Sequence, residues 1–189
     1  MSTTTSTGQQ SREARSAAIT AGIALALMAA LAPVAVFVAL PAGLVGVAAL
    51  VILLVVILDV IVAIALVPVF EQGGKTLAWI TAGLRITYAA VFAVAAAQLF
   101  GTADIAAFHS IWDAALLVFG AHLIALAILI WRAAAPKWLA ALIAIAALGY
   151  AIDAVMIALI ENPPFEAGIV TFVGEVVLIL WLLIKGGKR

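Results

Sequence analysis

Seven polar side chains lie inside long apolar stretches of the chain and form the candidate site. They are Asp59, Arg85, Tyr88, His122, Tyr150, Asp153 and Glu175. Arg85 is the one cation in the interior of such a stretch. An arginine at the centre of a bilayer costs about 2.5–3.5 kcal/mol on insertion scales and is rarely left without a partner. The sequence therefore predicts helices that pack so that Arg85 meets the acids.

Four of these side chains have the same predicted depth in the membrane. Asp59, Arg85, His122 and Glu175 each lie 10 or 11 residues from the inner end of their own apolar stretch. A helix rises about 1.5 Å per residue, which places all four about 15 Å deep. That depth is close to the middle of a hydrocarbon core about 30 Å thick. Four different stretches therefore bring ionisable groups to one level.

The other three polar residues are predicted to lie nearer the outer face. Tyr88 follows Arg85 by three residues, and Tyr150 precedes Asp153 by three residues. This spacing places each pair on one face of its helix. We expect the tyrosines and His122 to complete the hydrogen bonding of the site.

The charges of the candidate site do not balance. When His122 is neutral, the two carboxylates of Asp59 and Glu175 and the one guanidinium of Arg85 leave one excess negative charge. Asp153 adds a second negative charge. Low dielectric disfavours uncompensated charge. Either an acid holds a proton, or His122 is protonated, or a cation binds. The hypothesis is that Glu175 or Asp153 is the protonatable group.

Composition identifies the elements that position these residues. The chain has 189 residues, of which 68% are hydrophobic and 10% are charged. A membrane span needs roughly 20 apolar residues, and six stretches qualify: 16–40, 43–70, 75–100, 107–132, 138–160 and 166–185. The predicted fold is all-α, an integral membrane bundle of six helices forming one domain over residues 16–189. Residues 1–15 are polar and are predicted to be a disordered cytoplasmic tail. Within the first span, Pro33 is predicted to kink the helix.

The cations predict the orientation of the bundle. With the N-terminus inside, the inner side carries Arg12, Arg15, Lys75, Arg132, Lys137, Lys185, Lys188 and Arg189. The outer side then carries the acids Asp104, Glu161 and Glu166. Positive charge collects on the cytoplasmic side of membrane proteins. Six spans with both termini in the cytoplasm satisfy this rule.

Several kinds of chemistry lack the residues that they need. The chain has no cysteine, and no lysine lies within a span where a retinal could attach. His109 and His122 share one helix about 20 Å apart, too far to clamp one haem. No spacing demands a metal, and a net charge of zero gives no reason to expect nucleic acid. We expect no cofactor, no metal and no nucleic-acid partner, and we assign no catalytic residue.

Residues 55–187 resemble a bacterial family of multi-pass membrane proteins known as domain of unknown function 4386. The resemblance is carried, in order, by the motifs LDVIVAIAL, GLRITYA, VFGAHL, LGYAID and VGEVV. It implies a membrane bundle in the bacterial cytoplasmic (plasma) membrane, and the family's recurring polar positions correspond to the seven residues above. Family members have a larger segment between the first two spans, where this chain has little more than Pro41 and Ala42. The resemblance implies no activity.

Three functions are compatible with these observations. The leading hypothesis is a protein that binds or translocates a proton, an ion or a small polar solute, and a non-enzymatic role is favoured. The alternatives are a membrane scaffold or partner subunit with structural buried charges, and an enzyme acting on a lipid or quinone through His122 and a carboxylate. A cavity that reaches Arg85 would favour the binding function. A dry and fully paired cluster would favour the scaffold, and a lateral opening at His122 would favour the enzyme. Expected partners are membrane lipid and the small ligand, and faces of small residues leave a homodimer open.

Overall fold

A computed structural model describes residues 4–160, 165 and 167–188, and all its regular elements are helical. They are α1 (Thr4–Pro33), the π-helix η1 (Val34–Ala39), α2 (Val45–Phe70), the 3₁₀ helix η2 (Glu71–Gly73), α3 (Lys75–Ala97), α4 (Ile105–Arg132), α5 (Lys137–Leu159), α6 (Ala167–Thr171) and α7 (Val173–Ile184). The all-α prediction is confirmed for these residues. Five helices, α1 to α5, are long and apolar enough to cross a membrane.

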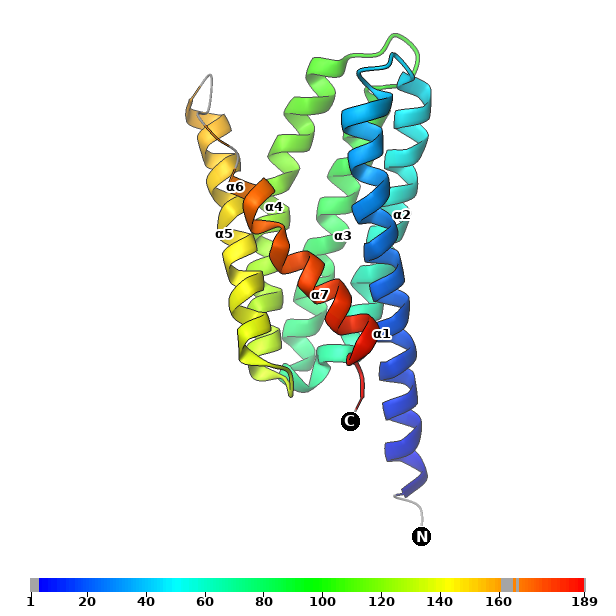
Figure 1. The fold of residues 1–189 in the computed structure, drawn as a ribbon, viewed down its shortest axis with the longest axis vertical. Coiled ribbons are helices and arrows are strands. Elements are labelled where there is room, and N and C mark those ends of the chain that lie inside the picture. The colour runs from blue at the N-terminus through cyan, green and yellow to red at the C-terminus, as the bar shows by residue number, and fades with distance from the viewer. Residues whose placement is uncertain (1–3, 161–164, 166, 189) are drawn as a thin grey trace.

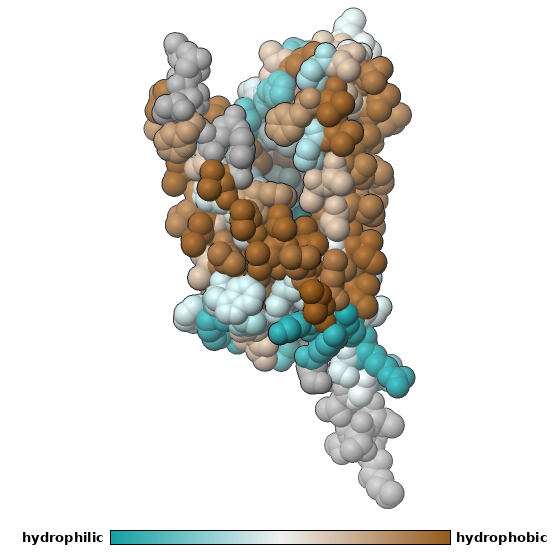
Figure 2. Space-filling model, in the orientation of Figure 1, coloured by the Kyte–Doolittle hydropathy of each residue, from teal (hydrophilic) through white to brown (hydrophobic). Residues whose placement is uncertain are grey.

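The distribution of polarity is that of a membrane protein. Asp59 and His122 are 0% exposed and Arg85 is 2% exposed. Large apolar side chains instead cover the outside of the long helices, among them Leu27, Leu50, Ile57, Ile64, Val94, Leu117, Ile128, Ile145 and Leu148. Figure 2 shows this apolar surface in brown, with hydrophilic residues gathered at the lower end. A soluble protein would arrange these groups the other way round.

The helices form a ring in which each long helix packs against the next in sequence. α1 contacts α2, α2 contacts α3, α3 contacts α4, and α4 contacts α5. The ring is closed by α7, which crosses obliquely from α5 to α1 and contacts both (Figure 1). The N-terminal part of α1 extends beyond the lower end of the bundle. Since α7 is short and oblique, it covers only part of the gap between α5 and α1.

Small residues permit the crossing of α7 over α5. A Cβ atom added to Gly174 would lie 2.5 Å from the backbone oxygen of Leu142 in α5. Any larger side chain at this position would therefore push the two helices apart. On the other side of α7, a Cβ atom on Gly22 of α1 would lie 2.8 Å from side-chain atoms of Leu183. Close approach through small residues is the usual way in which membrane helices pack.

The sixth predicted span differs from the expectation of one continuous helix. Its described part forms α6 and α7, which are separated by the single turn residue Phe172. The N–H of Glu175 bonds to the carbonyl of Phe172 at 2.9 Å, a three-residue spacing that tightens the backbone there. Residue 166 lies outside the described residues. Neither short helix reaches the length of a typical span alone, so six spans with both termini in the cytoplasm stay a prediction.

The N-terminal tail also differs from its prediction of disorder. From Thr4 onward it is helical and continuous with the first span in α1. Arg15 connects it to the end of α7, where its guanidinium donates to the carbonyls of Leu182, Leu183 and Gly186 at 2.6–3.0 Å. The last carbonyls of a helix have no partner within it, and those of Leu182 and Leu183 end α7. A charged donor from α1 therefore caps α7.

The winding of the first span changes after Pro33, and the kink predicted there stays a prediction. α-helical geometry ends at Pro33, and the next six residues form the π-helix η1. Leu40 N–H bonds to the carbonyl of Ala35 at 3.0 Å, a five-residue spacing. Proline lacks the N–H that would continue the α-helical ladder. The wider turn carries Val36 and Phe37 to the cavity described below.

Candidate functional site

Three of the predicted site residues form a buried cluster at the centre of the bundle. Arg85 on α3 makes an ion pair with Asp59 on α2, with 2.6 Å between Nη2 and Oδ1. The other terminal nitrogen of Arg85, Nη1, lies 3.2 Å from Nε2 of His122 on α4. Three neighbouring helices thus bring their ionisable residues to one level. The predicted meeting of Arg85 with an acid occurs, and that acid is Asp59.

The hydrogen bonds of His122 assign the proton on its ring. A guanidinium has only donors, so Nε2 accepts the hydrogen bond from Arg85. The other ring nitrogen, Nδ1, lies 2.9 Å from the carbonyl oxygen of Thr81 and donates to it. With one nitrogen accepting and the other donating, the imidazole is neutral. His122 orients Arg85 without adding a second positive charge beside it.

The cluster is not fully paired. Among the described residues, Nε of Arg85 and Oδ2 of Asp59 are buried atoms without a hydrogen-bond partner. Buried polar atoms are nearly always satisfied in native proteins. Arg85 also lines the cavity, while its unused Nε is itself buried.

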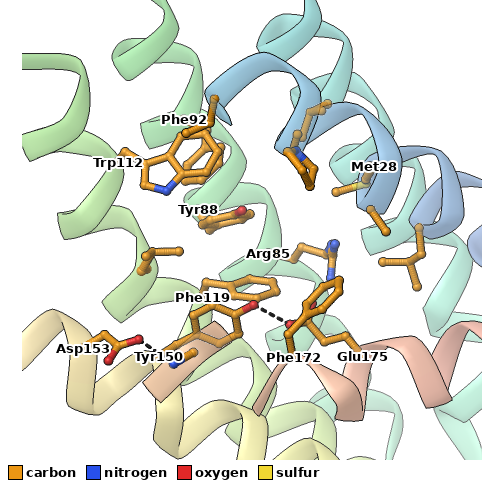
Figure 3. A pocket seen from close by; sticks show the side chains of 18 of the residues that line it. Met28, Arg85, Tyr88, Phe92, Trp112, Phe119, Tyr150, Asp153, Phe172 and Glu175 are labelled. Carbon is orange, nitrogen blue, oxygen red and sulfur yellow. Dashed lines mark hydrogen bonds between the residues drawn. The ribbon is translucent and has the colours of Figure 1, made fainter. Parts of the chain in front are cut away.

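Two other predicted residues form a second polar group on the opposite side of the ring. The hydroxyl of Tyr150 on α5 donates to Oε1 of Glu175 on α7 at 2.7 Å. Figure 3 shows the two side chains reaching toward each other below Phe119 and Arg85. Glu175 lies in the first turn of α7, where the helix dipole favours negative charge. Both side chains remain partly exposed.

Asp153 has a structural role in its present geometry. Its Oδ1 accepts the N–H of Ala167 at 2.7 Å, and its Oδ2 accepts the N–H of Gly168 at 2.6 Å. These N–H groups begin α6, so Asp153 on α5 caps that helix from 14 or 15 residues earlier in the chain. That Asp153 exchanges protons stays a prediction.

Phe119 links the two polar groups and was missed by sequence reasoning. Its ring centroid lies 5.5 Å from Cζ of Arg85, 5.8 Å from the His122 ring and 5.1 Å from the Tyr150 ring. Tyr88, the remaining predicted residue, is buried against Phe119 with 4.7 Å between ring centroids. Phe119 precedes His122 by three residues on α4, and this spacing was the signal that could have found it.

A cavity of about 390 Å³ opens beside these residues. It is bounded by α1 and η1 on one side, by α3, α4, α5, α6 and α7 on the others, and by Val55 of α2. Figure 2 shows the surface hollowed above α7, between α1 and α4. Five of the seven predicted residues line it, namely Arg85, Tyr88, Tyr150, Asp153 and Glu175. Asp59 and His122 lie behind Arg85, outside the lining.

The rest of the lining is apolar and aromatic. Phe92 and Trp112 pack with 4.0 Å between ring centroids, and Tyr88 lies 4.4 Å from Phe92. On the opposite side, α1 and η1 contribute the apolar residues Leu25, Met28, Ala29, Ala32, Pro33, Val36 and Phe37. Within the described residues, no three acidic or histidine side chains are grouped to hold a metal ion. The cavity thus has an apolar body and one polar end.

Comparison with known proteins gives two matches. A family model described as domain of unknown function (DUF4386) matches residues 102–186. A protein of Archaeoglobus fulgidus, described as uncharacterised, is 41% identical over 132 residues, which are 69% of this chain and 78% of that relative. No solved structure matches the chain.

Proposed function

The chain belongs to the DUF4386 family, whose description assigns no activity. From the cavity, we propose that this protein binds a small amphiphilic molecule within the membrane. The polar end of the molecule would contact Tyr150, Glu175 and Arg85, and its apolar body would lie between α1 and the aromatic wall. The observation that carries this proposal is the cavity of about 390 Å³ that reaches those three residues. Ligand pockets have volumes of about 300–1,000 Å³ and few, convergent polar groups.

The geometry favours binding over the two alternatives. A purely structural network would be closed, whereas Arg85 lines the cavity. An enzyme working through His122 would need that ring to reach its substrate. His122 is 0% exposed, and both its ring nitrogens are engaged. Asp59 and His122 therefore support the site from behind.

The proposal can be tested with Trp112 as a reporter. The chain has five tryptophans, and among the described residues that line the cavity Trp112 is the tryptophan. Replacing the other four with phenylalanine leaves a single fluorophore. This protein, in nanodiscs of neutral lipid, is titrated with three bromophenyl probes of similar size: an ammonium, a neutral hydrocarbon and a sulfonate. Bromine quenches indole on contact, so saturable quenching by at least one probe is expected.

Two alanines of α1 provide a matched pair of controls. Ala29 lines the cavity, whereas its neighbour Ala30 is exposed and does not. Ala29→Phe should fill the space and abolish saturable quenching, and Ala30→Phe should leave it unchanged. Quenching that rises linearly with every probe, and equally in both variants, would mean partition into lipid alone. That result would sink the proposed function.

A further inference from the structure

The polar end of the cavity has an excess of negative charge. Arg85 is the one cation among its described lining residues, and Asp59 lies 2.6 Å from its guanidinium. Asp59 therefore neutralises Arg85 from behind the cavity. Glu175 has the neutral hydroxyl of Tyr150 as its hydrogen-bond donor. A carboxylate in an apolar cavity needs a positive partner or a proton.

The second acid of the lining does not change this balance. Asp153 binds the two N–H groups that begin α6, and these donors stabilise its negative charge in place. It does not need a cation to be satisfied, and it adds to the negative potential of the cavity. Glu175 is thus the carboxylate whose charge the described residues leave without a counter-ion.

Aromatic rings surround the space in front of Glu175. Tyr88, Phe92, Trp112 and Phe119 follow one another along α3 and α4, and Phe172 lies beside Glu175 (Figure 3). The faces of aromatic rings attract cations within about 6 Å of the ring centroid, and most strongly where water is excluded. Phe119 already receives such a contact from Arg85. Carboxylate and aromatic faces together are the groups that recognise organic ammonium ions.

We infer that the ligand of this cavity is an amphiphilic cation, an organic ammonium whose charge pairs with Glu175 and whose apolar part packs against the aromatic wall. This inference rests on the proposed function and names the class of its ligand. An anion would instead be repelled by Glu175 and Asp153. The guanidinium of Arg85 would attract it little, because Asp59 already neutralises that charge. A neutral molecule would leave Glu175 either to hold a proton or to stay without a counter-ion.

The test compares the same three probes in the Trp112 protein. They are (4-bromobenzyl)trimethylammonium, its neutral isostere 1-bromo-4-neopentylbenzene and 4-bromobenzenesulfonate. The ammonium keeps its charge at every pH, and the isostere differs from it by one atom. In the wild-type site the ammonium should bind at least about tenfold more tightly than either other probe. Glu175→Gln should remove most of that advantage and leave the affinity of the isostere within about twofold.

Two further variants separate charge from folding. Glu71→Gln makes the same change in an exposed residue of η2, far from the lining, and should leave all three affinities unchanged. Tyr150→Phe removes the hydroxyl that donates a hydrogen bond to Glu175 but keeps the carboxylate of Glu175. It should therefore retain the preference for ammonium even if Glu175→Gln does not fold.

The outcomes distinguish the inference from the proposal beneath it. Equal binding of ammonium and isostere, or tighter binding of the sulfonate, would overturn the cationic ligand and keep the binding cavity. Saturable quenching by none of the probes would overturn both. A preference for ammonium that Ala29→Phe and Glu175→Gln each abolish would support both.

Discussion

At the scale of single residues, Arg85 belongs to two environments. One side of its guanidinium is held by Asp59 and His122, which the solvent does not reach. The other side borders the cavity and the ring of Phe119. A buried ion pair gains little over a well-packed apolar pair, but losing one partner leaves a buried charge uncompensated. The cluster therefore constrains sequence strongly while it contributes modest net stability.

This asymmetry gives a prediction for the ion pair. Asp59→Asn and Arg85→Met should each lower the free energy of unfolding by about 3–5 kcal/mol. The double variant should lose clearly less than the sum of the two, because it buries no unpaired charge. Reversible unfolding in mixed detergent micelles measures all three values. Glu71→Gln, on the surface, should change stability by less than about 0.5 kcal/mol. Additive losses in the double variant would mean that the two residues do not stabilise each other.

At the scale of elements, α7 determines the shape of the site. It carries Glu175, crosses α5 at Gly174 and ends against Arg15 of α1. Because α7 crosses obliquely, the upper part of the gap between α5 and α1 stays open, and the cavity lies there.

The contact at the end of α7 can be tested at Arg15. Arg15→Ala removes two hydrogen bonds to α7 carbonyls and one to the carbonyl of Gly186, and it should cost about 1–3 kcal/mol. Arg15→Lys keeps the charge near the helix end but loses the forked geometry, so it should cost less than the alanine variant. Arg12→Ala provides the control, because Arg12 is exposed on the same helix. Thermal unfolding of the four proteins in one detergent gives the comparison. Equal effects of Arg12→Ala and Arg15→Ala would show that the cap does not contribute.

At the scale of the whole molecule, the beginning of the first span meets the end of α7. Arg15 at the beginning of the first span contacts Gly186 after α7. Two points in contact lie on one side of the membrane, and a chain that returns to its starting side has crossed an even number of times. The five long helices alone would be an odd number. We therefore expect α6 and α7 together to act as the sixth crossing.

Cysteine labelling can test this topology, because the chain has no native cysteine. Single cysteines at Thr102, Ala134 and Lys188 report the α3–α4 loop, the α4–α5 loop and the C-terminal end. In intact cells, a membrane-impermeant maleimide should label position 102 alone. After permeabilisation it should label all three. If position 188 reacts in intact cells as position 102 does, the chain crosses five times and α7 does not complete a span.

The sequence by itself determined the class of protein and most of the buried cluster. Apolar stretches of membrane length have few stable alternatives to a helix, because the backbone must satisfy its own hydrogen bonds in lipid. Given helices, the rise per residue places Asp59, Arg85 and His122 at one depth, and burial of charge makes them seek one another. These inferences need only local geometry and the cost of desolvation.

The tertiary structure decided which groups pair and where the cavity lies. Depth does not give the rotation of a helix about its axis, so the sequence could not choose Asp59 over Glu175 as the partner of Arg85. The capping of α6 by Asp153, the central position of Phe119 and the contact between Gly174 and Leu142 all join residues on different helices. Such contacts depend on how side chains of several helices fill one space together. That filling is a property of the packed bundle, and no single stretch of sequence contains it.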